Sequence, residues 1–302
     1  MRITNQMMAN TVLQNLSTDE ARLETTLNEL TSGKSLSQMS DDPAVASRIL
    51  AIQTNLHQTA QYLSNASAAQ SWLNATSTAL QGVDQALLRA QQLATQGASD
   101  TSNASDRQAI ATEVNSLIDE VAQLGNTTYG GNYIFAGART DLAPFSSSGG
   151  AVSYANADPS SATTALQREI GPGITIQVNT IGHDPTTNGA VFDTVFAALS
   201  SLAQALQANN ASAISASITG ITNALQQVNQ AATSVGTRTD QVQTIQNQLT
   251  AQQTQLSQTL STLADADMAQ ASIDYSQATL VQQAGLSAAA KALPASLFNY
   301  LT

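Results

Sequence analysis

Histidine and cysteine, the residues that most often serve as a base near neutral pH, a thiolate nucleophile or a soft metal ligand, are scarce in this chain, which has two histidines and no cysteine. His57 falls in a segment with helical spacing and His183 in a Gly- and Pro-rich stretch, and neither has other ligand-type residues patterned nearby. Without cysteine, a disulfide framework, a thiolate nucleophile and a zinc–thiolate site are excluded. We expect neither histidine to bind a metal or to act as a catalytic base.

Two pairs of aspartates come closest to a paired-carboxylate site. In the pair Asp41-Asp42, the second residue stands directly before Pro43, an order typical of a helix N-cap followed by the first helical residue. On a helix, Asp265 and Asp267 would point about 200° apart and would not share a cation. We expect helix capping from the first pair and a metal site from neither.

The glycine and serine motifs of well-known enzyme classes are also missing. The stretch Gly130–Gly137 is rich in glycine, but no Gly-Lys-Ser/Thr follows it, so it does not predict a phosphate-binding loop. Serines are plentiful, yet there is no Gly-x-Ser-x-Gly motif, and two histidines offer little material for a catalytic triad. We expect no enzymatic activity, no catalytic residue, no cofactor and no metal.

Charge and composition narrow the range of partners. Asp and Glu number 21 against 10 Lys and Arg, a net charge of −11, so neither nucleic acid nor an anionic membrane is an expected partner. Only 10% of residues are charged, and Gln, Asn, Ser, Thr and Ala dominate. Uncharged polar faces cost less to bury than charged ones, which favours packing against other subunits. The alternative interpretation of this composition is an extracellular protein with an unusual surface.

Neither a cleaved signal peptide nor a membrane span is predicted. The first residues lack an apolar h-region, and no apolar run reaches about 18 residues. If the chain is exported, we expect a route that reads an uncleaved N-terminus.

Heptad spacing organises the helical parts of the chain. Apolar residues recur every three or four positions from Ile214 to Leu263, which predicts a helical stretch about 75 Å long with one face turned toward partner helices. Similar spacing predicts a helix over residues 5–31 and a second, very long helix from Pro43 onward. A rod of this length needs partner helices along its apolar face.

Breaks in this spacing mark the connections between helices. Gly33 is expected to end the first helix, and Gly33–Ser40 to form a short polar connection. A loop is predicted over Gly97–Asn103, after which Ser105 and Gln108 are expected to form a capping box at the start of a third helix.

The segment Gly125–Gly189 has a different character, because it contains ten of the 16 glycines and four of the six prolines. Helical spacing is lost, and short β-type runs begin at Tyr133, Val152 and Ile174. Helical spacing returns at Val191, so we predict a small β-rich domain inserted between helices.

Together these elements predict a mainly α fold with an inserted β-rich domain, in which a long antiparallel helical rod has its N- and C-terminal helices paired as a coiled coil. Three domains are expected: a terminal assembly domain of residues 1–40 plus 264–302, a rod domain of 41–135 plus 190–263, and a β-rich outer head of 136–189. The terminal segments have weak seams and many polar residues, so we expect both to be mobile in solution and helical only on assembly.

Several short motifs, each weak alone, are specific in their order and spacing. They are Met1–Thr4, Leu27–Gly33, Ser40–Pro43, Tyr129–Gly137 followed by Pro144–Phe145, Ser234–Arg238, Asp265–Met268 and Ser296–Leu301. On these motifs the chain resembles the flagellin-like family over about residues 1–145 and 190–302. The motifs near Tyr133 and at Ser296 resemble the junction members of that family.

The resemblance implies a mechanical adaptor subunit that joins the hook of a bacterial flagellum to the flagellin filament. It implies export through the flagellar type III apparatus without a cleaved signal peptide, and an extracellular location at the hook–filament junction. The implied partners are further copies of the chain in a ring, the neighbouring hook-associated junction protein, flagellin and a flagellar export chaperone. Nucleic acid and membrane are not among them.

The candidate functional residues are therefore apolar residues of an assembly interface. They are Leu16, Leu23, Leu27 and Leu30 near one end, and Leu256, Leu260, Leu263, Leu280, Leu286, Leu297, Phe298 and Leu301 near the other. Packing within the chain is the competing role, above all for the more central of these residues. Assembly contacts are favoured for those beyond Pro294.

Two other functions stay open. Flagellin shares the export route and the helical rod, but polymerises with itself. The cytoplasmic signalling helix bundle of chemoreceptors is also rich in Ala, Gln, Ser and Thr, but it predicts a continuous helical hairpin, against which the Gly- and Pro-rich insertion argues.

Overall fold

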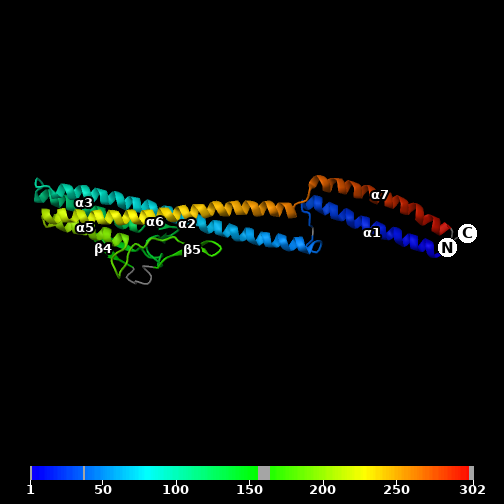
Figure 1. Ribbon diagram of the computed structural model, residues 1–302, viewed down its shortest axis with the longest axis horizontal. Coiled ribbons are helices and arrows are strands. Elements are labelled where there is room, and N and C mark those ends of the chain that lie inside the picture. Colours follow the sequence, from blue (N-terminus) through cyan, green and yellow to red (C-terminus); the bar gives the residue numbers. More distant parts are fainter. Residues whose placement is uncertain (1, 37, 156–163, 299–302) are drawn as a thin grey trace. The chain divides into compact units, whose positions relative to one another are not determined.

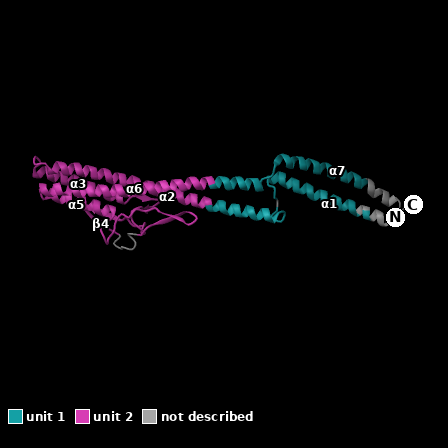
Figure 2. Cartoon of the chain, viewed as in Figure 1, with its two compact units in different colours: residues 1–58, 252–302 teal, residues 59–251 magenta. Residues whose placement is uncertain are grey.

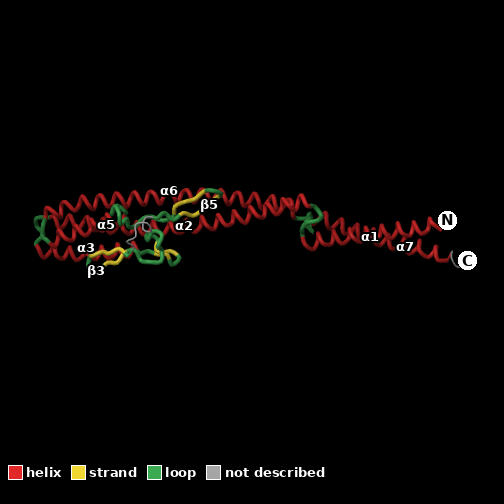
Figure 3. The backbone as a smooth tube through the Cα atoms, turned by 90° about the horizontal axis from the view of Figure 1, so that it is seen from below, coloured by secondary structure: helices red, strands yellow, loops and turns green. Residues whose placement is uncertain are grey.

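The computed structural model describes residues 2–36, 38–155 and 164–298 of the chain. Most of these residues are α-helical. The strands form small antiparallel sheets and lie, in sequence, between the third helix and α5 (Figures 1 and 3). The prediction of a mainly α chain with β structure between its helical parts is confirmed.

Long helices account for most of the chain. Their bounds are Arg2–Ser32 for α1, Pro43–Ala98 for α2, Ala104–Gly125 for α3, Val191–Gln207 for α5, Ala211–Ala264 for α6 and Met268–Phe298 for α7. The 54 residues of α6 carry the predicted heptad stretch without a break. The tight turn between α5 and α6, where Asn209 has a φ of +52°, was not located from the sequence.

The chain folds into two compact units (Figure 2). The terminal unit comprises residues 1–58 and 252–302, and the central unit comprises residues 59–251. The long helices α2 and α6 contribute one part to each unit.

The central unit contains the hydrophobic core. All the largest fully buried side chains among the described residues come from it, including Leu residues of α2 and Ile118 of α3. Phe192 of α5 packs between Phe135 and Phe145, with ring centroids 4.8 Å and 4.9 Å away. Aromatic rings bury large apolar areas, so this cluster fixes the β segments against the start of α5.

Three hairpins make up the β structure. Strand β1 (Thr128–Tyr129) pairs with β2 (Asn132–Tyr133), β3 (Phe145–Ser148) with β4 (Ala151–Tyr154), and β5 (Gln167–Gly171) with β6 (Ile174–Gln177), all antiparallel. Paired glycines with positive φ turn the first two hairpins, at Gly130–Gly131 and Gly149–Gly150. Two-residue hairpin turns need this backbone conformation, which glycine adopts without strain.

Two predicted helix starts have different outcomes. Asp42 caps α2 as predicted, since its Oδ1 accepts from the backbone N–H groups of Ala44 and Val45, each at 3.0 Å. The capping box predicted for α3 at Ser105 and Gln108 is wrong. Asn103 and Asp106 form it instead, because α3 begins two residues earlier, at Ala104.

Candidate assembly interface

Helix α1 shields one face at heptad spacing. Its half-buried and buried residues are Val12, Leu16, Asp19, Leu23, Thr26, Glu29 and Leu30, most of them three or four positions apart. Of the four predicted interface residues on this helix, Leu16, Leu23 and Leu30 are partly buried within the chain, whereas Leu27 is 44% exposed. Leu27 is therefore more exposed to solvent than the other three leucines.

Helix α7 lies beside α1 in the opposite direction (Figures 1 and 3). The residues it shields at heptad spacing are mostly small: Ala271, Tyr275, Ala278, Gln282, Gly285 and Ala289. At Gly285 an added Cβ atom would lie 3.5 Å from Leu16 Cδ1. Small residues on one helix thus meet larger residues on the other.

Four large apolar residues of α7 are directed away from this pairing. Leu280 is 67% exposed, and Ile273, Val281 and Leu286 are each about half exposed. Of the thirteen large apolar side chains exposed among the described residues, all but Leu88, Leu142 and Ile174 lie in the terminal unit. Exposed apolar surface gathered in this way is typical of sites that contact other proteins.

The predicted residues of α6 have a mixed environment. Leu256, Leu260 and Leu263 are all partly buried. Leu260 also lines an apolar pocket of about 310 Å³, together with Met39 and Leu50, which are 64% and 45% exposed. These α6 residues pack within the terminal unit, and Leu260 borders surface that is open to solvent.

The last three predicted residues lie at or beyond the C-terminal end of the described residues. The backbone of α7 continues through Leu297 and Phe298, whose side chains are not described, and Leu301 lies outside the described residues. Their assembly role stays a prediction.

Sequence reasoning missed a contact between the two connections of the terminal unit. Lys34 Nζ lies 2.6 Å from Asp265 Oδ1, and hydrogen bonds from Lys34 and Ser261 lower the pKa of the Asp265 carboxyl group. Asp265 and Asp267 do not lie on one helix, as the sequence reading assumed, but in the connection between α6 and α7. The one available signal was that Lys34 is one of only two lysines.

His183 is the buried histidine of the central unit. Its Nδ1 lies 2.5 Å from Asp193 Oδ1, and its ring stacks on Tyr154 at a centroid distance of 3.8 Å. Burial, followed by the charge of Asp193, raises the pKa of Tyr154 to about 12. Asp193 Oδ2 also accepts from the backbone N–H groups of Asp184 and Ala190.

This cluster joins β4 to the start of α5. The sequence reading found no partner for His183, although an aspartate in the first turn of the predicted helix at Val191 was a signal for one. Among the described residues, no group of three or more His, Cys, Asp or Glu is arranged to hold a metal ion. The arrangement is that of a structural contact between a hairpin and a helix.

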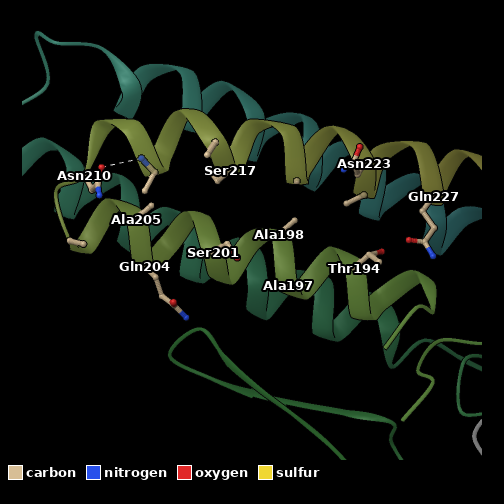
Figure 4. A pocket seen from close by; sticks show the side chains of 15 residues that line it. Thr194, Ala197, Ala198, Ser201, Gln204, Ala205, Asn210, Ser217, Asn223 and Gln227 are labelled. Carbon is tan, nitrogen blue, oxygen red and sulfur yellow. Dashed lines mark hydrogen bonds between the residues drawn. The ribbon is translucent and has the colours of Figure 1, made fainter. Parts of the chain in front are cut away.

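A groove of about 720 Å³ runs between α5 and α6 (Figure 4). Small side chains such as Ala198, Ala205 and Ser217 line it, with amides such as Gln204 and Gln227 among them. None of its lining residues is titratable, so the groove offers surface for packing and no acid or base.

Among the described residues, no helix combines the length and the apolar character that a membrane crossing requires.

Both helical parts of the chain match a known protein family. Residues 3–140 match the bacterial flagellin N-terminal helical region, and residues 218–301 match the bacterial flagellin C-terminal helical region. The chain is 27% identical over 264 residues to flagellar hook-associated protein 3 of Salmonella typhimurium, covering 81% of this chain and 82% of that protein.

Two further relatives agree with this placement. Flagellar hook-associated protein 3 of Escherichia coli is 31% identical over 147 residues, which cover 48% of this chain and 46% of that protein. The crystal structure of Bacillus cereus FlgL matches with a TM-score of 0.58 and 24% identity, over 70% of this chain and 99% of that one, and supports the fold. The chain belongs to the flagellin family, within which it is similar to the hook-associated proteins.

Proposed function

We propose that this chain is a structural adaptor of the bacterial flagellum that joins the hook to the flagellin filament. The similarity to hook-associated protein 3 over most of both chains supports this role above that of flagellin. The proposed partners are further copies of the chain in a ring, the neighbouring hook-associated junction protein, flagellin and an export chaperone. The role is mechanical, and the location is extracellular, at the hook–filament junction.

One observation carries the proposal: the terminal unit exposes large apolar side chains that its own helix pair does not bury. Leu27, Leu280 and Leu286 are exposed, while α7 turns alanine and glycine toward α1. A subunit that stays solitary gains nothing from such a surface, whereas a ring of copies buries it. Each buried leucine side chain contributes about 1.5–3 kcal/mol to association.

We further propose that residues 1–40 and 264–302 form the assembly domain, with α1 and α7 paired as a coiled coil. Residues 41–135 and 190–263 then form the rod, and residues 136–189 form an outer β-rich head. The heptad spacing of shielded residues on both terminal helices supports the pairing.

Deletion of the gene in its host tests the proposed function. Electron microscopy of the cell surface should show hooks without filaments, and unpolymerised flagellin should accumulate in the medium. Flagellin is still exported in the deletion strain, but it has no attachment point on the hook at which to form a filament. Expression of the wild-type chain from a plasmid is the control and should restore filaments.

Other outcomes separate the alternatives. Loss of flagellin from the medium would identify the chain as the filament subunit. Unchanged filaments and motility would contradict a role in the flagellum and would favour a signalling bundle or another function.

A further inference from the structure

One asparagine of the central unit has surroundings that favour a chemical change of its side chain. Asn188 is the only asparagine of the sequence that is followed by glycine. In such a pair the backbone nitrogen of the glycine can attack the side-chain amide of the asparagine, because glycine has no side chain to obstruct the approach. Asn188 and Gly189 are both exposed and lie in the connection between β6 and α5.

The side-chain amide of Asn188 is accessible to water. Asn188 has a φ of +49°, in the left-handed region that asparagine tolerates better than most residues. Within the part of the chain that the structure describes, no hydrogen bond holds its amide group. Asn188 also lines an open cavity of about 640 Å³ together with Tyr154 and Asp193. Solvent can therefore reach the group that would react.

The nitrogen that would attack is held by its neighbours. The Gly189 N–H donates to Thr187 Oγ1 at 3.2 Å, and the Thr187 hydroxyl donates to Asp184 Oδ2 at 2.5 Å. The Gly189 carbonyl accepts from Nε2 of Gln227 on α6, a residue labelled in Figure 4, at 2.5 Å. The peptide groups on both sides of Gly189 are thus fixed. Because the attack requires this nitrogen to lose its proton and to turn toward the Asn188 side chain, these contacts slow the reaction.

We propose that Asn188 is a deamidation site and that the hydrogen bonds of Gly189 to Thr187 and Gln227 set the rate of the reaction. The Gly189 nitrogen gives its proton to a base in solution and bonds to Asn188 Cγ. The bond from Cγ to Nδ2 breaks, and Nδ2 takes up protons and leaves as ammonia. Water then opens the cyclic imide at one of its two carbonyl carbons, which gives aspartate or isoaspartate. Water is the only co-reactant, and nothing is oxidised or reduced.

Modification at this position disturbs the start of α5. Both products place a carboxylate in the cavity that Asp193 also lines, and isoaspartate adds a methylene group to the backbone directly before Gly189. Asp193 accepts from the Ala190 N–H and contacts His183, so it joins the first turn of α5 to the segment before it. Deamidation of Asn188 therefore weakens this cap through charge repulsion and a longer backbone. The proposal does not depend on the proposed flagellar function.

Incubation of the full chain at mildly alkaline pH tests the site. The water carries a heavy oxygen isotope, and peptide mapping by mass spectrometry locates each asparagine that takes up this oxygen. Asn188 should be modified before the other asparagines of the central unit. Thr187→Val and Gln227→Met each remove one hydrogen bond to Gly189 and should speed modification of Asn188 by about two- to tenfold, the factor that corresponds to one hydrogen bond.

Matched controls are adjacent in the sequence. Thr186 is exposed in the same turn and contacts Asp184 through its backbone N–H, which Thr186→Val retains. Gln226 is exposed on α6 beside Gln227. Thr186→Val and Gln226→Met should leave the rate at Asn188 unchanged. Circular dichroism verifies that every variant is folded, and amide exchange in the first turn of α5 should be faster in the modified fraction than in the unmodified one.

Several results would overturn the proposal. An Asn188 that stays intact while other asparagines of the central unit change is not a deamidation site. An unchanged or slower rate in Thr187→Val and Gln227→Met would show that the contacts of Gly189 do not restrain the reaction. An equal acceleration in Thr186→Val would assign the effect to general loosening of the turn. Equal amide exchange at the start of α5 in both fractions would contradict the proposed effect on the cap.

Discussion

Arg107 shows how a single buried charge can hold three segments. Its Nε donates to the Gly97 carbonyl at 2.8 Å and its Nη1 to Asn209 Oδ1 at 2.6 Å, while its Nη2 reaches the Ser99 carbonyl. The end of α2, the start of α3 and the α5–α6 turn therefore meet at one guanidinium group. Removing it leaves the buried Gly97 carbonyl and two part-buried acceptors without this donor.

We predict that Arg107→Met lowers the free energy of unfolding of the central unit by about 2–4 kcal/mol. Urea denaturation followed by circular dichroism measures this loss. The control is Arg89→Met, which removes an exposed ion pair and should cost no more than about 1 kcal/mol. Equal losses in the two variants would contradict a special role for Arg107.

Tyr154 gives the central unit a pH dependence in alkaline solution. Its pKa is raised to about 12 in the folded chain by burial and by Asp193, against about 10 for an unfolded tyrosine. The unfolded chain therefore loses this proton first. The stabilising contribution is complete below pH 10 and is lost as the pH rises toward 12.

We predict that the Tyr154→Phe chain loses less stability than the wild-type chain between about pH 9 and about pH 11.5. The measurement is the urea midpoint at each pH. Tyr133→Phe is the control and should keep the full wild-type loss. The same loss in Tyr154→Phe and wild type would assign the alkaline transition to other groups.

At the scale of the helices, α7 has two faces with different tasks. We predict that the double variant Leu280→Gln and Leu286→Gln changes the free energy of unfolding by no more than about 0.5 kcal/mol, because both residues are exposed. It should nevertheless reduce filament attachment in the host, since both leucines belong to the proposed interface. Electron microscopy and swimming assays measure the defect.

The control for this variant is Leu88→Gln. Leu88 is 45% exposed on α2 in the central unit, close to the 49% of Leu286. It should support normal filaments. An equal defect in filament attachment in both variants, or no defect in either, would contradict a role for the exposed face of α7 in the interface.

The opposite face of α7 depends on small residues. We predict that Gly285→Ala keeps or improves protection from amide exchange in α1 and α7, because the added Cβ meets Leu16 at an ordinary contact distance of 3.5 Å and alanine favours helix. Gly285→Leu should raise exchange in both helices by forcing them apart. Equal exchange in the two variants would contradict close packing at this position.

At the scale of the whole molecule, the central unit contains the hydrophobic core. The terminal unit carries most of the exposed large apolar side chains among the described residues. We predict that removal of residues 296–302 leaves a folded and secreted chain that does not join the hook. Circular dichroism, detection in the medium and electron microscopy measure the three properties. Full filaments on cells with only the shortened chain would refute an assembly role for Leu297, Phe298 and Leu301.

One expectation about the whole chain stays a prediction. Residues 1–40 and 264–302 were expected to be mobile before assembly, whereas the structure has α1 and α7 as helices within one compact unit. Amide exchange of the wild-type protein distinguishes mobile terminal segments from a folded helix pair.

The sequence alone was enough for features that depend on near neighbours along the chain. The heptad stretch from Ile214 to Leu263 and the N-cap Asp42 were both predicted and are present. Helices and tight turns are set by contacts within about four residues, so their signals are local. The capping box at Asn103 was missed because neighbouring polar residues offer competing local signals.

Only the tertiary structure decided which faces meet. Lys34 and Asp265 are 231 positions apart, and nothing local pairs them. Likewise, Leu16 and Leu280 look alike in a heptad pattern, but one packs within the chain and the other is exposed. Heptad spacing identifies an apolar face without naming its partner, because the partner is set by which distant segments the fold brings together.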